Sequence, residues 1–247
     1  MQVLIYAKTG WPSGRILARS LNAAGVAARR TRVWPTCLRH WQHPTLIVSW
    51  GGRLSAPAGS VLNGSPVADK REELRRLAEA GVPVPEVTDA DLPEAERALW
   101  LGRSRNHYAG LDLLRGVRHP SFYVRRLNLV DEFRVHVFDG KCICVGRKVP
   151  SDEPSAYRSD WIRSRVAGWR IAFDDEARAA AEGRAIRTRS KAAVAALGYN
   201  FGAVDVGVED TGRTVVLEVN SAPGLSDYTA AKYAEAIRCR LIGGPHP

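Results

Sequence analysis

The sequence predicts a mixed α/β (α+β) fold, and three patterns along the chain indicate it. Residues 2–52 contain two apolar strands with a helical segment between them, which is the pattern of a small α/β unit. Residues 122–149 form a predicted hairpin-like region with the turn dipeptide Asp139-Gly140, and residues 203–220 form a second predicted hairpin. Helical segments follow both hairpins, so we expect sheets that are covered by helices.

The N-terminal elements are defined by their apolar spacing. Residues 2–7 and 45–52 are apolar enough for buried strands, and residues 14–25 carry apolar side chains at helical intervals. A loop rich in Gly, Pro and Ser follows over residues 54–66. Residues 68–81 then predict a helix whose last residue, a glycine, takes the position of a C-terminal cap.

The remaining elements alternate between extended and helical chain. Residues 82–87 leave the preceding helix in an extended form, and residues 97–116 predict another hairpin-like region. Residues 175–197 are rich in Ala and Arg and predict one long helix. A closing helix is predicted over residues 228–240.

The composition is that of an ordinary globular protein. With 247 residues, of which 45% are hydrophobic, the chain is long enough for one or two compact domains. Its apolar runs are far shorter than the roughly 20 residues that span a bilayer, so no membrane segment is predicted. The N-terminal residues lack the pattern of a secretory signal, and we expect a cytoplasmic protein. The four cysteines lack metal-ligand spacing, which favours structural thiols.

The net charge of +10 raises the question of nucleic-acid binding. Lys and Arg are scattered through the chain, and no aromatic-rich basic strand or known nucleic-acid module accompanies them. The pattern favours a solvated basic surface over nucleic-acid binding. Part of this charge would also attract anionic ligands such as nucleoside triphosphates and carboxylates.

Asp205, Glu218 and Asn220 interrupt the two apolar strands of the last hairpin. With a two-residue turn at Thr211-Gly212, Asp205 would lie opposite Glu218, with Cβ atoms about 5 Å apart. Asn220 would follow on the same face, so three oxygen-bearing side chains would converge on a site suited to Mg²⁺ and phosphates. A satisfied polar network at a strand end is the alternative. Clustered acids need compensating cations, however, and this favours the metal site.

The order of Asp205, Glu218, Asn220 and then Pro223-Gly224 resembles the metal-binding hairpin and following loop of the ATP-grasp superfamily. That superfamily includes D-alanine:D-alanine ligase and the ribosomal-protein glutamate ligases. Residues 59–85 resemble its introductory segment, and residues 131–141 resemble its central strand pair. The chain is also similar to short bacterial and phage ATP-grasp proteins that join carboxylates to amines.

The resemblance implies the fold and its domain organisation. An ATP-grasp domain over residues 61–247 would consist of two α+β subdomains, residues 61–125 and 126–247, which grip ATP between them. A small, reduced Rossmann-like α/β unit over residues 1–60 would precede it.

The resemblance also implies a nucleotide site. Its expected residues are Lys70, Arg103, Tyr123, Val124, Arg125, Glu132, Arg147 and Lys148. Residues 123–125 would hold the adenine edge through their backbone, Glu132 would receive the ribose hydroxyls, and the basic side chains would face the phosphates. A basic residue at a strand end is often simply solvated, so each of these assignments competes with that reading.

Two departures from the family pattern are visible. The phosphate-covering loop has only one interior glycine, Gly110, and the side chains of Arg105, Asn106 and His107 would have to supply donors in place of a glycine-rich backbone. Some ligases also place an arginine two residues before the metal aspartate, where this chain has Ala203.

The missing arginine has two candidate replacements, Arg134 and Arg163. Either would stabilise the tetrahedral centre of the reaction, and the main-chain N–H of Gly224 would donate to its oxyanion. His136 lies near this group in sequence, but a packed polar residue is the favoured interpretation.

The expected function is that of an ATP-dependent carboxylate–amine ligase that forms an amide or peptide bond through an acyl phosphate. ATP and Mg²⁺, with Mn²⁺ as a substitute, would be the cofactors, and the substrates would be small-molecule or peptide carboxylates and amines. Family members are often dimers or tetramers, so a homodimer is a further expectation. The alternatives are a phosphotransferase with the same ATP site and a nucleotide-binding module that has lost turnover.

Overall fold

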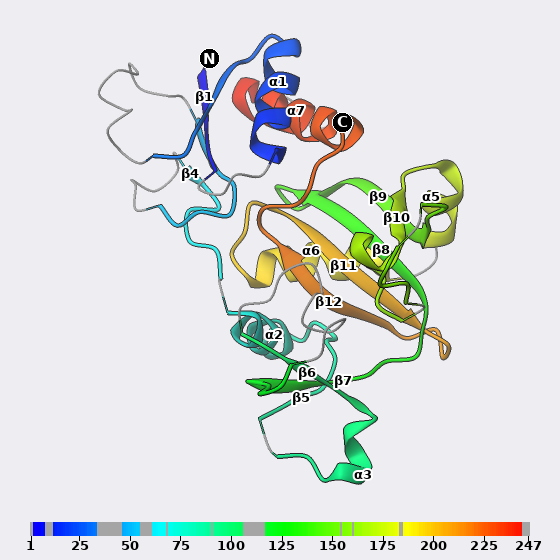
Figure 1. Cartoon of the computed structure of the whole chain (residues 1–247). Coiled ribbons are helices and arrows are strands. Elements are labelled where there is room, and N and C mark those ends of the chain that lie inside the picture. Colours follow the sequence, from blue (N-terminus) through cyan, green and yellow to red (C-terminus); the bar gives the residue numbers. More distant parts are fainter. Residues whose placement is uncertain are drawn as a thin grey trace.

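The computed structural model describes residues 2–7, 12–33, 46–54, 61–67, 69–89, 91–105, 117–153, 155–159, 161–182 and 185–243. Three sheets are present within these residues, with four, five and three strands. Figure 1 shows the four-stranded sheet at one end of the molecule, the five-stranded sheet in the middle and the three-stranded sheet at the other end.

The N-terminal unit is a parallel sheet with the strand order β2-β1-β3-β4. Its strands are β1 (Gln2–Tyr6), β2 (Ala27–Thr31), β3 (Leu46–Ser49) and β4 (Val61–Leu62). Helix α1 (Ser13–Ala23) connects β1 to β2, as a parallel pair requires a crossover. The predicted strand–helix–strand unit is confirmed, and β2 and β4 extend it.

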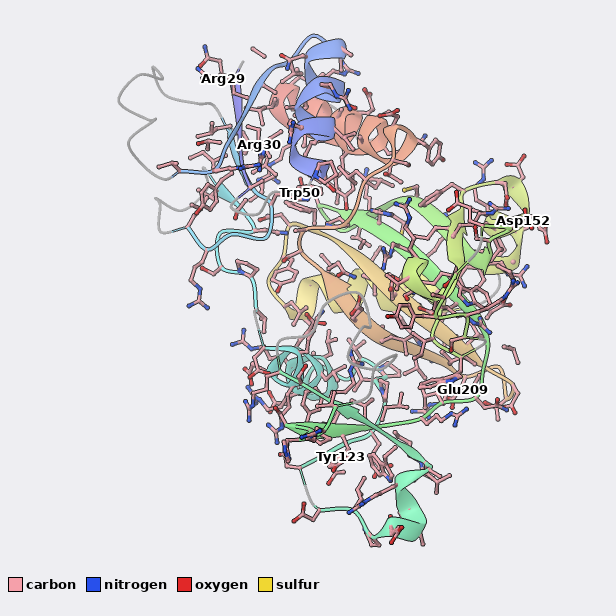
Figure 2. All side chains as sticks on the ribbon, viewed as in Figure 1. Arg29, Arg30, Trp50, Tyr123, Asp152 and Glu209 are labelled. Carbon is pink, nitrogen blue, oxygen red and sulfur yellow. The ribbon has the colours of Figure 1, made fainter. Side chains whose placement is uncertain are left out.

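The C-terminal helix α7 (Asp227–Ile242) completes the core of this N-terminal unit. It packs against α1, and Figure 1 shows the two helices side by side. Trp50, labelled in Figure 2, stacks on Phe201 with ring centroids 5.1 Å apart and meets the edge of Tyr233 at 5.5 Å. The two ends of the chain therefore share one hydrophobic core with the end of the large sheet.

The large sheet is antiparallel throughout, with the order β10-β9-β8-β11-β12. Its strands are β8 (Leu129–Phe138), β9 (Lys141–Pro150), β10 (Trp169–Ala172), β11 (Phe201–Glu209) and β12 (Thr214–Asn220), and the short helix η2 (Arg165–Ala167) precedes β10. The predicted turn is confirmed, because Asp139 and Gly140 both have positive φ, at 43° and 74°.

The two faces of the large sheet differ in polarity. On β8, the side chains of Phe133, Val135 and Val137 belong to the apolar core beneath helix α6 (Ile186–Ala196). The alternate residues of β8 on the other face are polar: Glu132, Arg134 and His136. Because successive side chains of a strand point to opposite faces, the same alternation that builds the core also lines a polar surface.

The single helix predicted over residues 175–197 is wrong. The structure has two helices there, α5 (Asp175–Ala181) and α6, and Glu182 at the end of α5 is extended at φ −69° and ψ 147°. The break lets the two helices pack on different strands, with α5 against β9 and α6 against β8 and β11. A helix pattern in sequence does not reveal such a change of direction.

The three-stranded sheet has the order β5-β7-β6 and is antiparallel. Its strands are β5 (Val87–Thr88), β6 (Trp100–Arg103) and β7 (Phe122–Arg125), with the short helix α3 (Glu94–Arg97) before β6. The hairpin predicted within residues 97–116 is replaced by pairing of β6 with β7, and residues 106–116 lie outside the described residues. β7 likewise belongs to this sheet rather than to the hairpin of β8 and β9.

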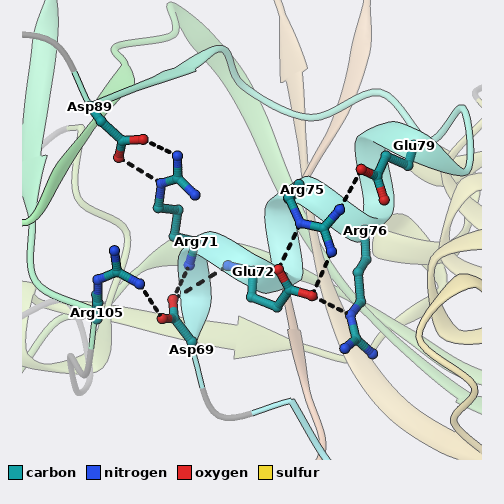
Figure 3. A network of polar contacts seen from close by, with 8 residues as sticks. All are labelled: Asp69, Arg71, Glu72, Arg75, Arg76, Glu79, Asp89 and Arg105. Atoms are coloured by element: carbon teal, nitrogen blue, oxygen red, sulfur yellow. Dashed lines mark hydrogen bonds and ion pairs between the residues drawn. The ribbon is translucent and has the colours of Figure 1, made fainter.

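Helix α2 (Lys70–Glu79) lies between the small sheet and the edge of the large one. Leu74 packs with Phe122 and Val124 of the small sheet, whereas Leu77 packs in the core of the large sheet. The carboxylate of Asp69 caps the helix by accepting the N–H groups of Arg71 and Glu72, as Figure 3 shows. Gly81 follows at φ 73°, as the predicted C-terminal cap requires.

None of the helices that the structure describes has the length and apolarity needed to cross a membrane. The boundaries at residues 60/61 and 125/126 stay predictions.

Candidate active site

A β-bulge in β12 directs Glu218 toward Asp205. Asp205 pairs with Glu218, but the next residue of β11, Val206, pairs with Val216, so Leu217 is the extra residue. Val216 faces the core, and without the bulge Glu218 would share that face. Bulges often redirect side chains beside functional sites. The predicted pairing of Asp205 and Glu218 is therefore confirmed.

The turn on which that prediction rested is wrong. The loop is wider than Thr211-Gly212, because the N–H of Glu209 donates to the carbonyl of Arg213 and Gly212 adopts φ 81° within the loop. The bulge at Leu217 compensates for this change of register. Two deviations from a regular hairpin thus give the pairing that a regular hairpin would have given.

Asp205 accepts hydrogen bonds from two basic side chains on the neighbouring strands. Arg134 donates from Nε to Oδ1 at 2.6 Å and from Nη2 to Oδ2 at 2.7 Å, in a bidentate pair. Lys148 donates from Nζ to Oδ2 at 3.0 Å and also bonds to Glu132. Asp205, Glu132 and Lys148 are all largely buried, so two acids and two bases form one compact network.

Glu218 and Asn220 lie beside this network and connect it to helix α2. Asn220 donates from Nδ2 to Oε1 of Glu218 at 2.8 Å. The ammonium nitrogen of Lys70 lies 3.7 Å from Oε2 of Glu218 and 3.2 Å from Oε1 of Glu73. The site therefore joins the small-sheet side of the molecule, through α2, to the polar face of the large sheet.

The charges of the site are stabilised by one another. Burial opposes ionisation of Asp205, but Arg134 and Lys148 outweigh it and hold the pKa of this carboxyl well below its usual value. Burial likewise opposes ionisation of Glu218, yet Lys70 and Arg134 lower its pKa to about 2. Both carboxylates are thus ionised at neutral pH and available to a cation.

These residues fit a hard divalent cation. Asp205, Glu218 and Asn220 offer two ionised carboxylates and an amide oxygen, and Mg²⁺ commonly uses one or two carboxylates together with phosphate and water oxygens. In the described part of the chain, no group of three or more His, Cys, Asp and Glu side chains is arranged to hold a metal. The set would therefore need further oxygen ligands from a substrate. Asp205 keeps lone pairs for a metal although it accepts three hydrogen bonds, because a carboxylate has about four acceptor sites.

Arg147 lies on the opposite face of the sheet from the site. It pairs with Phe133, a core residue, and its side chain bonds to Asp131 at 2.8 Å and approaches Glu176 of α5 at 3.5 Å. Lys148, the next residue, faces the site. Adjacent residues of a strand cannot share a face, so we do not carry Arg147 into the nucleotide site.

Arg163 supports the start of β8. Its guanidinium donates to the carbonyls of Leu129 and Val130, at 2.9 and 3.3 Å, and lies 4.9 Å from the ring centre of Trp169. It contributes to the electrostatic environment of Glu132 but forms no hydrogen bond with Asp205 in the structure described. Arg134 is the arginine that the structure brings to the metal aspartate.

The residues expected at the adenine edge occupy the central strand of the small sheet. Tyr123 and Val124 pair with both β5 and β6, and the N–H of Arg125 donates to the carbonyl of Glu86. Figure 2 shows Tyr123 on this sheet. Their backbone edges are used by the sheet itself, so the connection to the large sheet, and with it the expected hinge, shifts to residues 126–128.

Three other predicted residues lie around this site. Arg103 ends β6, and the carbonyl of Arg105 two residues later accepts the N–H of Lys70 at 3.4 Å. Arg105 itself bonds to the helix cap Asp69 at 2.8 Å, as Figure 3 shows, whereas Asn106 and His107 lie outside the described residues. Gly224 is exposed in the loop after β12, and a Cβ there would meet open space.

The sequence analysis missed Glu73. This side chain is 2% exposed, on the inner face of α2, and it contacts both Lys70 and β12. The available signal was its position three residues after Lys70, within the same helical stripe as Leu74 and Leu77. His136 is the packed residue that was favoured: it is 1% exposed and lies 3.2 Å from the hydroxyl of Tyr233.

Solved structures with similar folds cover nearly the whole chain. The ATP-grasp ligase PsnB in complex with a minimal precursor has a TM-score of 0.63 at 17% identity, covering 96% of this chain and 99% of that one. D-alanine–D-alanine ligase from Bacillus anthracis has a TM-score of 0.64 at 16% identity, covering 98% and 95%. The macrocyclase MdnC from Microcystis aeruginosa MRC, bound to its precursor peptide MdnA, has a TM-score of 0.59 at 15% identity, covering 98% and 99%.

At these identities the similarity shows a shared fold. No curated protein matches the sequence. The sequence model of an ATP-grasp domain family, described as family 3 of its clade, matches residues 69–239, which include α2, the small sheet, the large sheet and most of α7. The chain therefore belongs to this family of ATP-grasp domains.

Proposed function

We propose that this protein is an ATP-dependent carboxylate–amine ligase that releases ADP and forms an amide bond through an acyl phosphate. The observation that carries the proposal is the polar face of the large sheet, where Asp205, Glu218 and Asn220 lie among Arg134, Lys148 and Lys70. Buried acids and bases in such density are costly to fold unless they bind something. Their charges suit a metal–triphosphate complex.

The roles of the residues follow from their chemistry. Asp205, Glu218 and Asn220 would hold Mg²⁺, or Mn²⁺ in its place, which would neutralise charge on the phosphates. Arg134 and Lys148 would exchange part of their contact with Asp205 for phosphate oxygens, and Lys70 would reach the phosphates from α2. Glu132 would accept the ribose hydroxyls once Lys148 turns to the phosphates.

The reaction balances in two steps without a protein nucleophile. An oxygen of the substrate carboxylate attacks the γ-phosphorus, the bond between that phosphorus and the bridging oxygen breaks, and ADP leaves. The amine nitrogen then attacks the acyl carbon, loses a proton, and phosphate leaves as the C–O bond breaks. Arg134 would stabilise the negative charge that develops in both steps, and the N–H of Gly224 is the proposed oxyanion donor.

The substrate class is drawn from the solved relatives and stays a proposal. PsnB and MdnC are a ligase and a macrocyclase with precursor peptides, and the third relative joins two D-alanines. We therefore propose an amino acid or peptide as the carboxylate and as the amine. An assembly of two copies is part of the same proposal.

A screen of amino acids and short peptides tests this function. The protein is incubated with Mg²⁺ and ATP, with an acid, with an amine, and with both, and ADP and products are measured by mass spectrometry. We expect little ADP without substrates, some with the acid, and full turnover with both, with one amide per ADP. Glu218→Ala, checked for folding by circular dichroism, should abolish turnover.

Two results would contradict the proposal. A stable phosphorylated product without an amide would identify a phosphotransferase. Tight ATP binding without ADP release, across a broad set of acids and amines, would identify a binding module.

A further inference from the structure

Glu73 lies between the two halves of the proposed ATP site. Its carboxylate oxygen Oε1 accepts the main-chain N–H of Val219 at 2.9 Å and the ammonium of Lys70 at 3.2 Å, and Oε2 lies 3.4 Å from the same ammonium. Val219 is flanked by Glu218 and Asn220, the proposed metal ligands. One buried side chain of α2 therefore contacts the backbone of the metal strand and the nearby lysine.

The position of β12 explains why its backbone needs such a partner. β12 is an edge strand, so its outward N–H groups have no neighbouring strand. The chain around α2 supplies acceptors instead: Pro83 accepts from Val216 at 2.8 Å, and Glu73 accepts from Val219. A neutral acceptor would satisfy this N–H equally well, so hydrogen bonding of the strand does not account for a charged group that is 2% exposed.

The charge of Glu73 is accounted for by Lys70. The ammonium is closer to Glu73 than to Glu218, which lies 3.7 Å away. If Glu73 lost its charge, the ammonium would be drawn to Glu218 and would compete with a metal for that carboxylate. The carboxylate of Glu73 thus keeps Lys70 beside Glu218 without binding to it tightly.

We propose that Glu73 is a positioning residue that holds Lys70 away from Glu218 and fixes the β12 backbone between Glu218 and Asn220, so that metal and phosphate can be bound together. This inference rests on the proposed function of the site. It assigns a role in substrate binding to a residue that need not touch the substrate.

The test compares Glu73→Gln with a matched control on the same helix. Glutamine keeps an acceptor for the N–H of Val219 but removes the charge beside Lys70. Glu72 serves as the control because it faces outward and pairs with Arg75 and Arg76, as Figure 3 shows, so Glu72→Gln alters only exposed ion pairs. Isothermal titration calorimetry with Mg²⁺ and a nonhydrolysable ATP analogue measures binding to each folded variant, independently of any acid or amine.

We expect Glu73→Gln to weaken binding of the analogue about ten-fold, as the loss of a charged hydrogen bond would, and Glu72→Gln to stay within about two-fold of the unaltered chain. Lys70→Met should weaken binding as well. In the double variant of Lys70→Met and Glu73→Gln, no ammonium remains to compete for Glu218. Its affinity should therefore equal that of Lys70→Met within about two-fold, because the two changes act through one interaction.

Each outcome separates the inference from the function on which it rests. If the unaltered chain does not bind the analogue, the proposed function fails and the inference fails with it. If the unaltered chain binds and Glu73→Gln binds equally well, Glu73 is merely structural and the inference alone is overturned. Additive losses in the double variant would likewise contradict a role that acts through Lys70.

Discussion

The side chains of Arg147 and Lys148 show how the strand geometry assigns roles to neighbouring residues. Both are basic and adjacent in sequence, yet Arg147 bonds to Asp131 on the helix-covered face and Lys148 bonds to Asp205 and Glu132 on the polar face. Lys148 is largely buried between two acids, whereas the side chain of Arg147 remains 31% exposed. Their replacements should therefore have different consequences.

Lys148→Met should destabilise the protein by about 3 kcal/mol, because it leaves buried carboxylates with one cation fewer. It should also weaken ATP binding. Arg147→Met removes a more exposed pair, should cost about 1 kcal/mol or less, and should leave ATP affinity unchanged. Urea unfolding and calorimetric titration of both variants provide the measurement. Equal loss of ATP affinity in the two variants would contradict the assignment of faces.

His136 makes the stability of the protein depend on pH. Burial, with the nearby Arg134, lowers the pKa of His136 to about 3 from an ordinary 6.5. Between these values the unfolded chain binds a proton that the folded chain does not, so the free energy of unfolding falls as the pH falls from 6.5 toward 3. This part of the stability is fully present only above pH 6.5.

His136→Gln should remove this dependence. Between about pH 6.5 and about pH 5, the unaltered chain should lose about 2 kcal/mol more of its unfolding free energy than the variant does. Urea unfolding at a series of pH values checks the difference. Parallel pH profiles for the two proteins would show that His136 titrates normally in the folded state.

At the scale of elements, local sequence patterns predicted helices and hairpins well where they depend on caps and turns. The turn at Asp139-Gly140 and the end of α2 at Gly81 are confirmed, since positive φ at these residues is a local property. The split between α5 and α6 and the pairing of β6 with β7 depend on which distant strands each segment contacts. A single sequence carries no direct record of those contacts.

The cap of α2 is an element whose two contacts can be separated by mutation. Asp69 accepts backbone N–H groups of the first helical turn and also bonds to Arg105. Asp69→Ala should cost about 1 kcal/mol through the lost cap, whereas Asp69→Asn, which still caps, should stay within about 0.5 kcal/mol of the unaltered chain. Thermal unfolding compares the two. A similar loss for both variants would indicate that the pair with Arg105 dominates.

The same limit explains how much of the site was visible in the sequence. Asp205, Glu218 and Asn220 were found because acids in apolar strands stand out, and the pairing of the two acids is confirmed. Arg147 could not be separated from Lys148 without the register of β8 and β9, which shifts at His136 and Val137. Glu73 was hidden in a charged helix, because only the packed structure shows which of its acids points inward.

At the scale of the whole molecule, the chain closes on itself through α7. The fully buried Tyr233 on this helix contacts Trp50 of the N-terminal unit and Phe138 and Phe201 of the large sheet. Its hydroxyl lies 3.2 Å from Nδ1 of His136. The N-terminal unit and the large sheet should therefore unfold together.

Tyr233→Ala should cost about 3 to 5 kcal/mol, as for other large aromatic residues in a core, and Tyr233→Phe about 1 kcal/mol, through the hydroxyl alone. Hydrogen exchange of the amides in β1 and β11 follows both parts of the molecule. Protection should fall in both strands together in the alanine variant. Loss of protection in β1 alone would contradict a shared core.

The most direct test of the account follows the oxygen atoms of the substrate carboxylate. The acid identified by the screen is labelled with ¹⁸O in its carboxylate and incubated with Mg²⁺, ATP and the amine, and the released phosphate is analysed by mass spectrometry. If an acyl phosphate forms on the face of Asp205, Glu218 and Asn220, each phosphate should carry one ¹⁸O and each amide should retain the other. Unlabelled phosphate, with both labels left in the carboxyl product, would contradict the account.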